Sequence, residues 1–115
     1  MMNWKKIRIV YPHAYQRFVE VMFPYVGVIG LSTLYLFDPK KLYYFFDKEK
    51  VFLMIERFGP NQWLYTITLG DGSVFCPTQS SRNSREEIEF DGFTECFRVL
   101  NNQLALETNI NSVQD

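Results

Sequence analysis

The sequence predicts an α+β fold in which a three-stranded antiparallel β-meander leads into one long helix. Two turn signals, Gly59-Pro60-Asn61 and Gly70-Asp71-Gly72, separate three strand-like runs. The third observation is a capping box at Ser84 and Glu87, where each side chain is spaced to accept from the other residue's backbone N–H. A run of strands followed by a helix is typical of α+β folds. Strands that alternate with helices would instead indicate a parallel sheet.

Two helices are predicted before the sheet. Asn3 is placed to cap the first, and Pro12 suits the first turn of the second, where no backbone donor is needed. Pro24 ends the second helix, and residues 25–37 are too apolar for a solvated linker but leave helix and strand open. The apolar positions at helical spacing are Trp4, Ile7 and Val10, then Ala14, Phe18, Val21 and Met22.

A third short helix and the first strand follow. Asp38 and Pro39 have the pattern of a cap and a first helical residue, and a charged turn is predicted at residues 47–50. Residues 51–55 are continuously apolar. Such a run predicts a strand that is covered on both faces or lies in the middle of a small sheet.

Alternation and turn chemistry predict the other two strands. Residues 63–69 alternate between large apolar and smaller side chains, the period of a strand with one face in the core. The Asp71-Gly72 pair predicts a tight hairpin turn with positive φ at both central residues. Residues 73–76 form the third strand, which ends before Pro77 at a sheet edge because proline cannot donate to a ladder.

The last helix is predicted over residues 85–104, packed on the sheet by one apolar stripe. Gly92 within it costs about 1 kcal/mol relative to alanine, which predicts the close approach of another backbone. Residues 108–115 are predicted to form a flexible tail. The stripe consists of Phe90, Phe93, Cys96, Phe97, Leu100 and Leu104.

Length and composition predict a single domain over residues 1–115 with an aromatic core. A chain of this length buries roughly 65% of its unfolded surface, enough for one core. Eleven Phe, seven Tyr and two Trp exceed what a small interior holds, so some rings are predicted at the surface.

The formal net charge of −1 argues against a protein that coats nucleic acid or an anionic membrane. The charge is unevenly distributed. Residues 1–57 carry nine Lys and Arg against five acids, net +4, and residues 58–115 carry three against eight, net −5. This asymmetry allows charge-steered association.

Cysteine usage and the apolar segments predict a cytoplasmic protein with no membrane partner. No N-terminal stretch has the pattern of a signal peptide, and two free thiols, Cys76 and Cys96, are expected in a reducing compartment. Residues 21–37 form a run of 17 uncharged residues. Its proline and glycines make it a poor and slightly short membrane span.

Aromatic motifs relate the chain to one group of proteins. They are Asn3-Trp4-Lys5, Tyr11-Pro12, Leu42-Tyr43-Tyr44-Phe45-Phe46-Asp47, a Trp-containing strand, and Ser80-Ser81-Arg82 before a helix with Phe93, Phe97 and Leu100. In these the chain resembles small uncharacterised proteins of the prophages and mobile elements of gut bacteria, over most of residues 3–104. The resemblance implies the fold and a cytoplasmic setting. It implies no activity, because the motifs are packing patterns.

No enzymatic or cofactor chemistry is indicated. His13 is the one histidine, and nothing in the sequence brings it to either cysteine to form a nucleophile–base pair. Two cysteines and one histidine leave a tetrahedral zinc site one ligand short, and no phosphate-binding glycine motif is present. We expect no catalytic, cofactor-binding or metal-binding residues, a buried Cys96, and a more accessible Cys76.

A macromolecular partner is the remaining interpretation, and the sequence favours a small non-catalytic accessory protein that binds another protein. Glu87, Asp91 and Glu95, at i, i+4 and i+8, describe one solvent-facing helix stripe as a candidate protein contact. The alternative is single-stranded or double-stranded nucleic acid, held by basic residues with rings between them as stacking platforms. The basic candidates are Lys5, Lys6, Arg8, Arg17, Lys40 and Lys41.

Overall fold

The computed structural model confirms the α+β class, with four helical segments and a three-stranded antiparallel sheet in its described part. Residues 3–22, 39–75 and 84–114 are described, with side chains as far as Glu107 in the last range. The elements are α1 (Trp4–Val10), a second helix over residues 12–22, α3 (Pro39–Lys48), β1 (Val51–Gly59), β2 (Gln62–Leu69), β3 (Val74–Phe75) and α4 (Arg85–Gln114).

Some sequence predictions fall outside the described residues. They are the helix end at Pro24, the segment 25–37, the cap at Asp38, and the strand end at Cys76 and Pro77.

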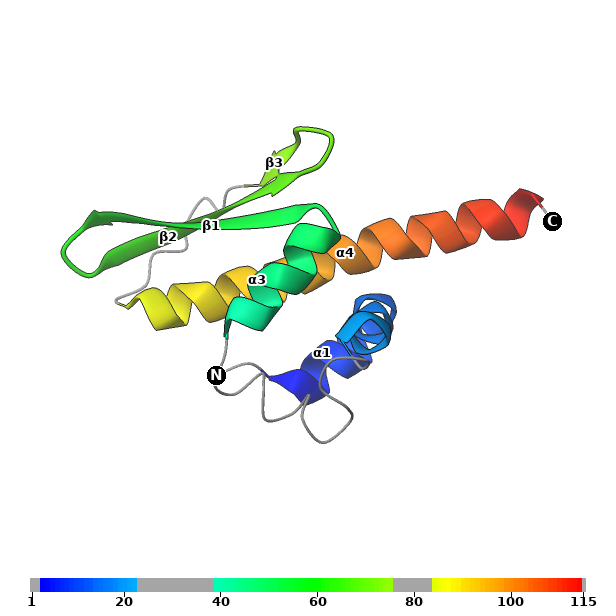
Figure 1. The fold of residues 1–115 in the computed structure, drawn as a ribbon, viewed down its shortest axis with the longest axis horizontal. Helices are drawn as coiled ribbons and strands as arrows, with labels where there is room; N and C mark the ends of the chain where they lie inside the picture. The colour runs from blue at the N-terminus through cyan, green and yellow to red at the C-terminus, as the bar shows by residue number, and fades with distance from the viewer. Residues whose placement is uncertain (1–2, 23–38, 76–83, 115) are drawn as a thin grey trace.

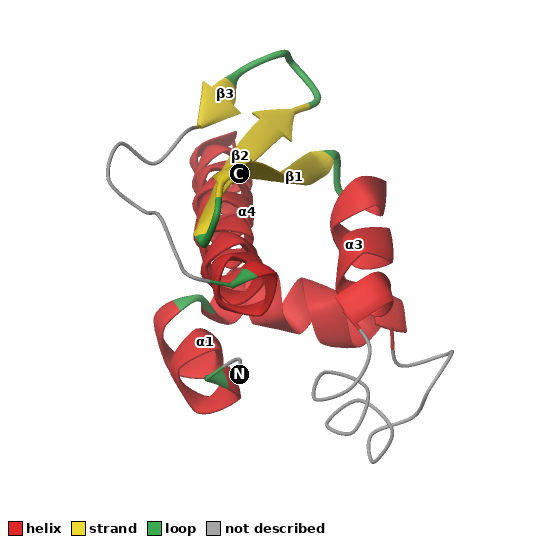
Figure 2. Cartoon of the chain, turned by 90° about the vertical axis from the view of Figure 1, so that its left-hand side faces the viewer, coloured by secondary structure: helices red, strands yellow, loops and turns green. Residues whose placement is uncertain are grey.

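The described elements lie in three layers (Figure 1). The sheet forms one outer layer, and α3 and α4 pack against one of its faces. The helix of residues 12–22 and α1 lie on the far side of α3 and α4, which Figure 2 shows from the end of the molecule. The middle helices are therefore covered on both sides, whereas the sheet is covered on one.

The N-terminal helices form as predicted and meet without a loop. The Asn3 side chain accepts a hydrogen bond from the backbone N–H of Lys6 at 3.1 Å, which caps α1. Tyr11 donates its N–H to the Ile7 carbonyl at 2.8 Å and accepts from the N–H of Tyr15 at 3.0 Å, so this one residue ends α1 and starts the next helix.

A residue from another element caps the second helix. The side-chain oxygen of Asn101 in α4 accepts from the backbone N–H groups of His13 at 2.8 Å and Ala14 at 3.1 Å. A helix leaves its first N–H groups without intrahelical partners, and the tyrosine side chain that precedes this helix is not a usual capping group. Asn101 supplies the acceptor, and this fixes the second helix against α4.

The third helix begins at Pro39 as predicted but continues through Lys48, so the predicted charged turn at 47–50 is confined to residues 49 and 50. Lys50 adopts a left-handed backbone conformation with φ of 59° and leads directly into β1. The connection between α3 and the sheet is therefore one tight turn.

The sheet has the order β1-β2-β3, with both pairs antiparallel. The alternation predicted for the second strand is confirmed, because Tyr65, Ile67 and Leu69 are buried and their neighbours are less so. The prediction that residues 51–55 form a central strand or one covered on both faces is wrong. β1 is an edge strand, and Phe52 and Met54 are exposed, because the helices pack on one face of the sheet.

The hairpin between β2 and β3 is looser than predicted. Leu69 donates its N–H to the Ser73 carbonyl at 2.8 Å, which leaves a three-residue loop. Of these residues Gly72 alone has positive φ, at 92°, so the prediction of two central residues with positive φ is wrong. Asp71 adopts negative φ and its side chain instead accepts from the N–H of Ser73 at 2.9 Å. This bond lowers the pKa of the Asp71 carboxyl.

The last helix starts at the predicted cap, where Ser84 Oγ accepts from the Glu87 N–H at 3.2 Å. The predicted helix end at residue 104 is wrong, since α4 continues to Gln114. The apolar period does stop near Leu104, but no glycine or proline follows Gly92 to break the helix.

The core is an aromatic cluster built by all four helices. The rings of Phe18 and Phe45 meet edge to face with centroids 4.7 Å apart, as do those of Phe46 and Phe97 at 4.9 Å. Trp4 stacks on Phe18 at 5.9 Å. The predicted apolar stripe of the last helix is confirmed, with Phe93, Cys96, Phe97 and Leu100 buried and Phe90 and Leu104 partly so.

Candidate interaction surface

The register of the sheet defines which side chains share the face opposite the helices. Phe52 pairs with Thr68, Met54 with Thr66, and Glu56 with Leu64, while Thr68 also pairs with Val74 of β3. Paired residues point to the same face of a sheet. Because Val51, Ile67 and Leu69 are buried against the helices, these partners point the other way. We call this set the outer face: Phe52, Met54, Glu56, Leu64, Thr66, Thr68 and Val74.

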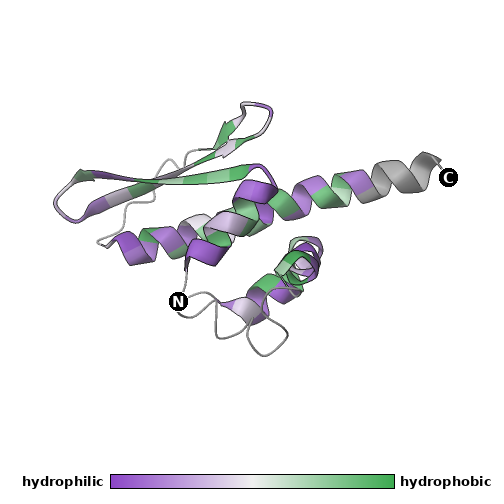
Figure 3. Cartoon of the chain, viewed as in Figure 1, coloured by the Kyte–Doolittle hydropathy of each residue, from purple (hydrophilic) through white to green (hydrophobic). Residues whose placement is uncertain are grey.

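Large apolar side chains on the outer face are exposed. The exposed fraction is 41% for Phe52, 52% for Met54 and 56% for Val74. In Figure 3 the hydropathy colouring marks much of β1 as hydrophobic. No described element covers this face, since α3 and α4 contact the sheet from the other side (Figure 1). The outer face is therefore an apolar surface that the described fold leaves open to solvent.

One charged residue stands at each end of β1 on this face. Lys50 accepts a hydrogen bond at its carbonyl from the Gly70 N–H at 3.1 Å, and its Cβ lies 3.1 Å from where a Cβ on Gly70 would be. The lysine stem thus continues the outer face beyond Phe52. Glu56 is half-buried at the other end. Within the described part of the chain, neither Lys50 nor Glu56 forms a salt bridge.

The far end of β1 carries an irregularity. The register shifts between Arg57 and Gly59, which leaves Phe58 as an extra residue that is 64% exposed. The Arg57 guanidinium lies 5.8 Å from the centre of the Trp63 ring, and its Nε donates to the Gly59 carbonyl at 3.3 Å. These contacts fix the end of the hairpin, and Phe58 adds another apolar ring beside the outer face.

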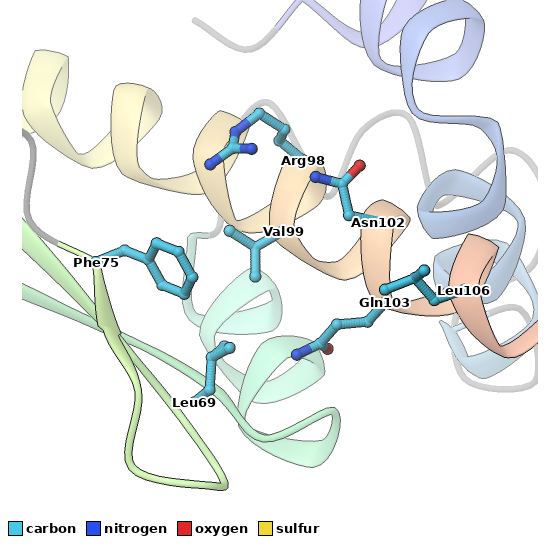
Figure 4. Close-up of a pocket in the computed structure, with 7 residues that line it drawn as sticks. All are labelled: Leu69, Phe75, Arg98, Val99, Asn102, Gln103 and Leu106. Carbon is cyan, nitrogen blue, oxygen red and sulfur yellow. The ribbon is translucent and has the colours of Figure 1, made fainter.

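A small pocket of about 140 Å³ lies between the β2–β3 edge of the sheet and α4 (Figure 4). Phe75 and Leu69 line it from the sheet. Among its lining residues Arg98 is the one ionisable side chain, so the pocket offers no acid–base pair. The remaining lining residues are Val99, Asn102, Gln103 and Leu106, all on α4.

The acidic candidates of the last helix differ in exposure. Glu87 is exposed, but Asp91 and Glu95 are half-buried. Glu95 accepts from Arg98 Nε at 2.7 Å. Burial, and then Glu95 and Asp91, raises the pKa of Tyr65 on β2 to about 12. The two inner carboxylates therefore lie beside the sheet, and Glu87 is the most exposed of the three predicted residues.

The basic candidates lie on three different helices. Lys5, Lys6 and Arg8 are exposed on α1. Lys40 and Lys41 are exposed in the first turn of α3. Arg17 is half-buried, and its guanidinium lies 3.8 Å from the Glu49 carboxylate.

A buried carboxylate was missed by sequence analysis. Glu89, 9% exposed, accepts a 2.7 Å hydrogen bond from the Tyr43 hydroxyl, and Arg85 Nε lies 3.8 Å from the same oxygen. Burial, followed by this hydrogen bond, raises the pKa of Tyr43 well above its ordinary value. The only sequence signal is helical spacing, since Glu89 lies one residue after the buried Ile88 in an otherwise solvated acidic turn. The contact links α3 to α4.

Other candidates for chemistry are placed as follows. Cys96 is fully buried, which confirms its assignment to the core, and burial raises the pKa of its thiol. His13 is exposed at the start of the second helix. Among the residues that the structure describes, no group of His, Cys, Asp and Glu has the arrangement of a metal site. None of the described helices is long and apolar enough to cross a membrane.

These observations define a three-layered α+β protein with one open, apolar sheet face. The chain matches no protein-family model, and no curated protein or solved structure is significantly similar to it.

Proposed function

We propose that this protein is a small non-catalytic accessory protein that binds another protein molecule through the outer face of its sheet. The observation that carries the proposal is the exposure of Phe52, Met54 and Val74 on a face that no described element covers. The largest exposed apolar patch of a soluble protein is often an interaction site.

The chemistry of the outer face supports binding over catalysis. Its members are apolar residues, two threonines and the single carboxylate of Glu56. A reaction would need a nucleophile beside a base, or paired acids in a cleft, and the flat face offers neither. The described pocket supports the same reading, since Arg98 is its one ionisable group.

A protein surface fits the outer face better than nucleic acid does. Phosphate binding requires clustered lysine and arginine, whereas among the described residues Lys50 is the one basic side chain that adjoins this face. The basic residues of α1 and of α3 belong to other layers (Figure 2). The resemblance to prophage proteins favours the cytoplasm of a bacterium as the setting, so a bacterial lysate is the source in which to look for a partner.

The test is an affinity pull-down with the tagged chain from a bacterial lysate to which untagged chain is added, with and without nuclease. Met54→Lys places an unpaired charge in any complex that covers the outer face. Ile9→Lys is the matched control, because Ile9 is 64% exposed on α1, in a different layer.

We expect a stoichiometric protein to be retained by the wild type and by Ile9→Lys after nuclease treatment, and to be lost by Met54→Lys. Capture that persists in Met54→Lys, or capture that vanishes with nuclease, would contradict the proposed function. The second result would favour a nucleic-acid partner.

A further inference from the structure

We propose that the occupant of the outer face is a second copy of this chain, so that two sheets pack face to face around a two-fold axis. This inference rests on the proposed function and names its partner. Three observations carry it: the order of side chains along β1, the charges at its two ends, and the size of the face.

The order of side chains along β1 is compatible with a two-fold axis level with residue 53. Within β1 the outer face has rows at residues 52, 54 and 56, about 6.8 Å apart along the extended strand, and Lys50 continues the face from the turn that precedes β1. Consider a two-fold axis that lies midway between the two stacked sheets and runs perpendicular to their strands. It makes β1 of one copy antiparallel to β1 of the other, so the order of the side chains is reversed between the copies. Phe52 of one copy then faces Met54 of the other, twice, and apolar area meets apolar area.

The charges at the ends of the rows are complementary under the same operation. The axis brings Lys50 of one copy opposite Glu56 of the other, on both sides of the dimer. Neither residue forms a salt bridge within the described part of the chain, so both are available at the rim. A parallel arrangement would instead set lysine against lysine and glutamate against glutamate, which is unfavourable.

The size of the face fits a second copy of itself. β1, β2 and the two-residue β3 lie about 4.8 Å apart, and together with the positions from Lys50 to Glu56 they give a face of about 10–15 Å by 20–25 Å. Its corrugated accessible area is on the order of 500–600 Å² per copy, at the lower limit of specific interfaces. Sheets packed this way lie about 10 Å apart with strands about 30° from alignment, within reach of Phe, Met, Lys and Glu side chains. The expected product is a reversible dimer, populated as the concentration rises through the micromolar range.

The first test measures the mass of the purified full chain by sedimentation equilibrium over a concentration series. We expect the average mass to rise from 13.7 kDa toward twice that value. Met54→Lys should raise the dimer dissociation constant by about tenfold or more, because it buries an unpaired charge. Ile9→Lys should leave it unchanged. A wild type that stays monomeric, or a dimer that Met54→Lys leaves intact, would overturn the inference.

The second test addresses the geometry with a charge exchange. Lys50→Glu and Glu56→Lys each set like charges against one another at two places and should weaken the dimer about fivefold. The double variant restores opposite charges and should recover the wild-type constant. Failure of this recovery would overturn the antiparallel arrangement. Circular dichroism of each variant confirms that the fold is retained, which we expect since neither side chain is fully buried.

The outcome separates this inference from the proposed function. If the purified chain is monomeric while Met54→Lys abolishes capture of a lysate protein, the partner is a different protein and the proposed function stands. If the chain is monomeric and Met54→Lys captures the same proteins as the wild type, the dimer inference and the proposed function are both wrong.

Discussion

The sequence predicts that another backbone lies close to Gly92, but the structure places a side chain there instead. A Cβ at Gly92 would lie 2.7 Å from Cδ1 of Leu53, so a side chain of the sheet occupies the space and not another backbone. A contact this short cannot form without movement of one of the partners. Gly92 thus allows α4 to lie close to β1.

We predict that Gly92→Ala loses most of the roughly 1 kcal/mol that alanine gains over glycine in a helix, because the half-buried Leu53 side chain must move to admit the new methyl group. In a Leu53→Val background the crowding methyl groups are withdrawn, and the same change should stabilise by about 1 kcal/mol. Urea denaturation of the four proteins measures both values. Equal effects in the two backgrounds would refute the role assigned to Leu53.

The buried tyrosines make stability sensitive to alkaline pH. Tyr65 has a pKa of about 12 in the folded protein, whereas tyrosine in the unfolded chain titrates near pH 10. Between these values the folded state holds a proton that the unfolded state has lost, so the free energy of unfolding falls as pH rises, by about 1.4 kcal/mol per pH unit for one group. The raised pKa of Tyr43 adds a loss of the same sign.

We predict that Tyr65→Phe reduces the slope of unfolding free energy against pH between pH 10 and 12 by about 1.4 kcal/mol per unit. Chemical denaturation at a series of pH values measures it. Wild type and variant should show parallel behaviour below pH 9. An unchanged alkaline slope would show that Tyr65 titrates normally in the folded state.

At the level of elements, α4 contacts three other elements of the fold through specific residues. Asn101 caps the helix of residues 12–22, Glu89 binds Tyr43 of α3, and Leu53 of β1 lies over Gly92. Each contact joins residues far apart in sequence. The helix that closes the chain therefore fixes the elements that precede it.

We predict that Asn101→Ala destabilises the protein by about 1–2 kcal/mol, since two backbone N–H groups lose their acceptor. Asn101→Asp should retain most of the stability, because a carboxylate accepts the same bonds and is favourable at the positive end of a helix. Asn102→Ala is the matched control on the exposed neighbouring residue and should have little effect. Thermal unfolding followed by circular dichroism compares the three. Equal loss in Asn101→Ala and Asn102→Ala would contradict the capping role.

For the whole molecule, the aromatic cluster unites the helical layers with the sheet into one core. Phe97 contacts the rings of Trp4, Phe45 and Phe46, while Tyr65 and Ile67 of the sheet belong to the same buried cluster. One continuous core predicts that the layers unfold together.

The two tryptophans report on separate layers, because Trp4 lies in α1 and Trp63 in β2. In Trp63→Phe, which retains Trp4, we predict that fluorescence and far-ultraviolet circular dichroism give the same urea midpoint. Trp4→Phe, which retains Trp63, should likewise give coincident midpoints. A fluorescence transition that precedes the dichroism transition in either variant would show that its layer unfolds independently.

Much of the fold follows from local patterns. The cap at Asn3, the helix start at Pro39 and the cap at Ser84 are read directly from the sequence, because each depends on neighbouring residues alone. The alternation of β2 is equally local. The candidate site was not predictable in the same way. The continuous apolar run of β1 predicts a strand that is covered on both faces or lies in the middle of the sheet, and Glu89 falls in an acidic turn whose spacing predicts exposure to solvent.

The sequence by itself determined the class, the order of the described elements and the apolar stripe of α4, because hydrophobic period and capping chemistry act over a few residues. Only the tertiary structure decided which sheet face is covered, where β1 lies in the sheet, and which distant side chain caps the second helix. All three features depend on how the layers stack. An apolar run such as that of β1 forms a strand equally well whether or not a second layer covers its other face, so the local sequence does not distinguish the two cases. The outer face is open because all the described helices pack on the other side.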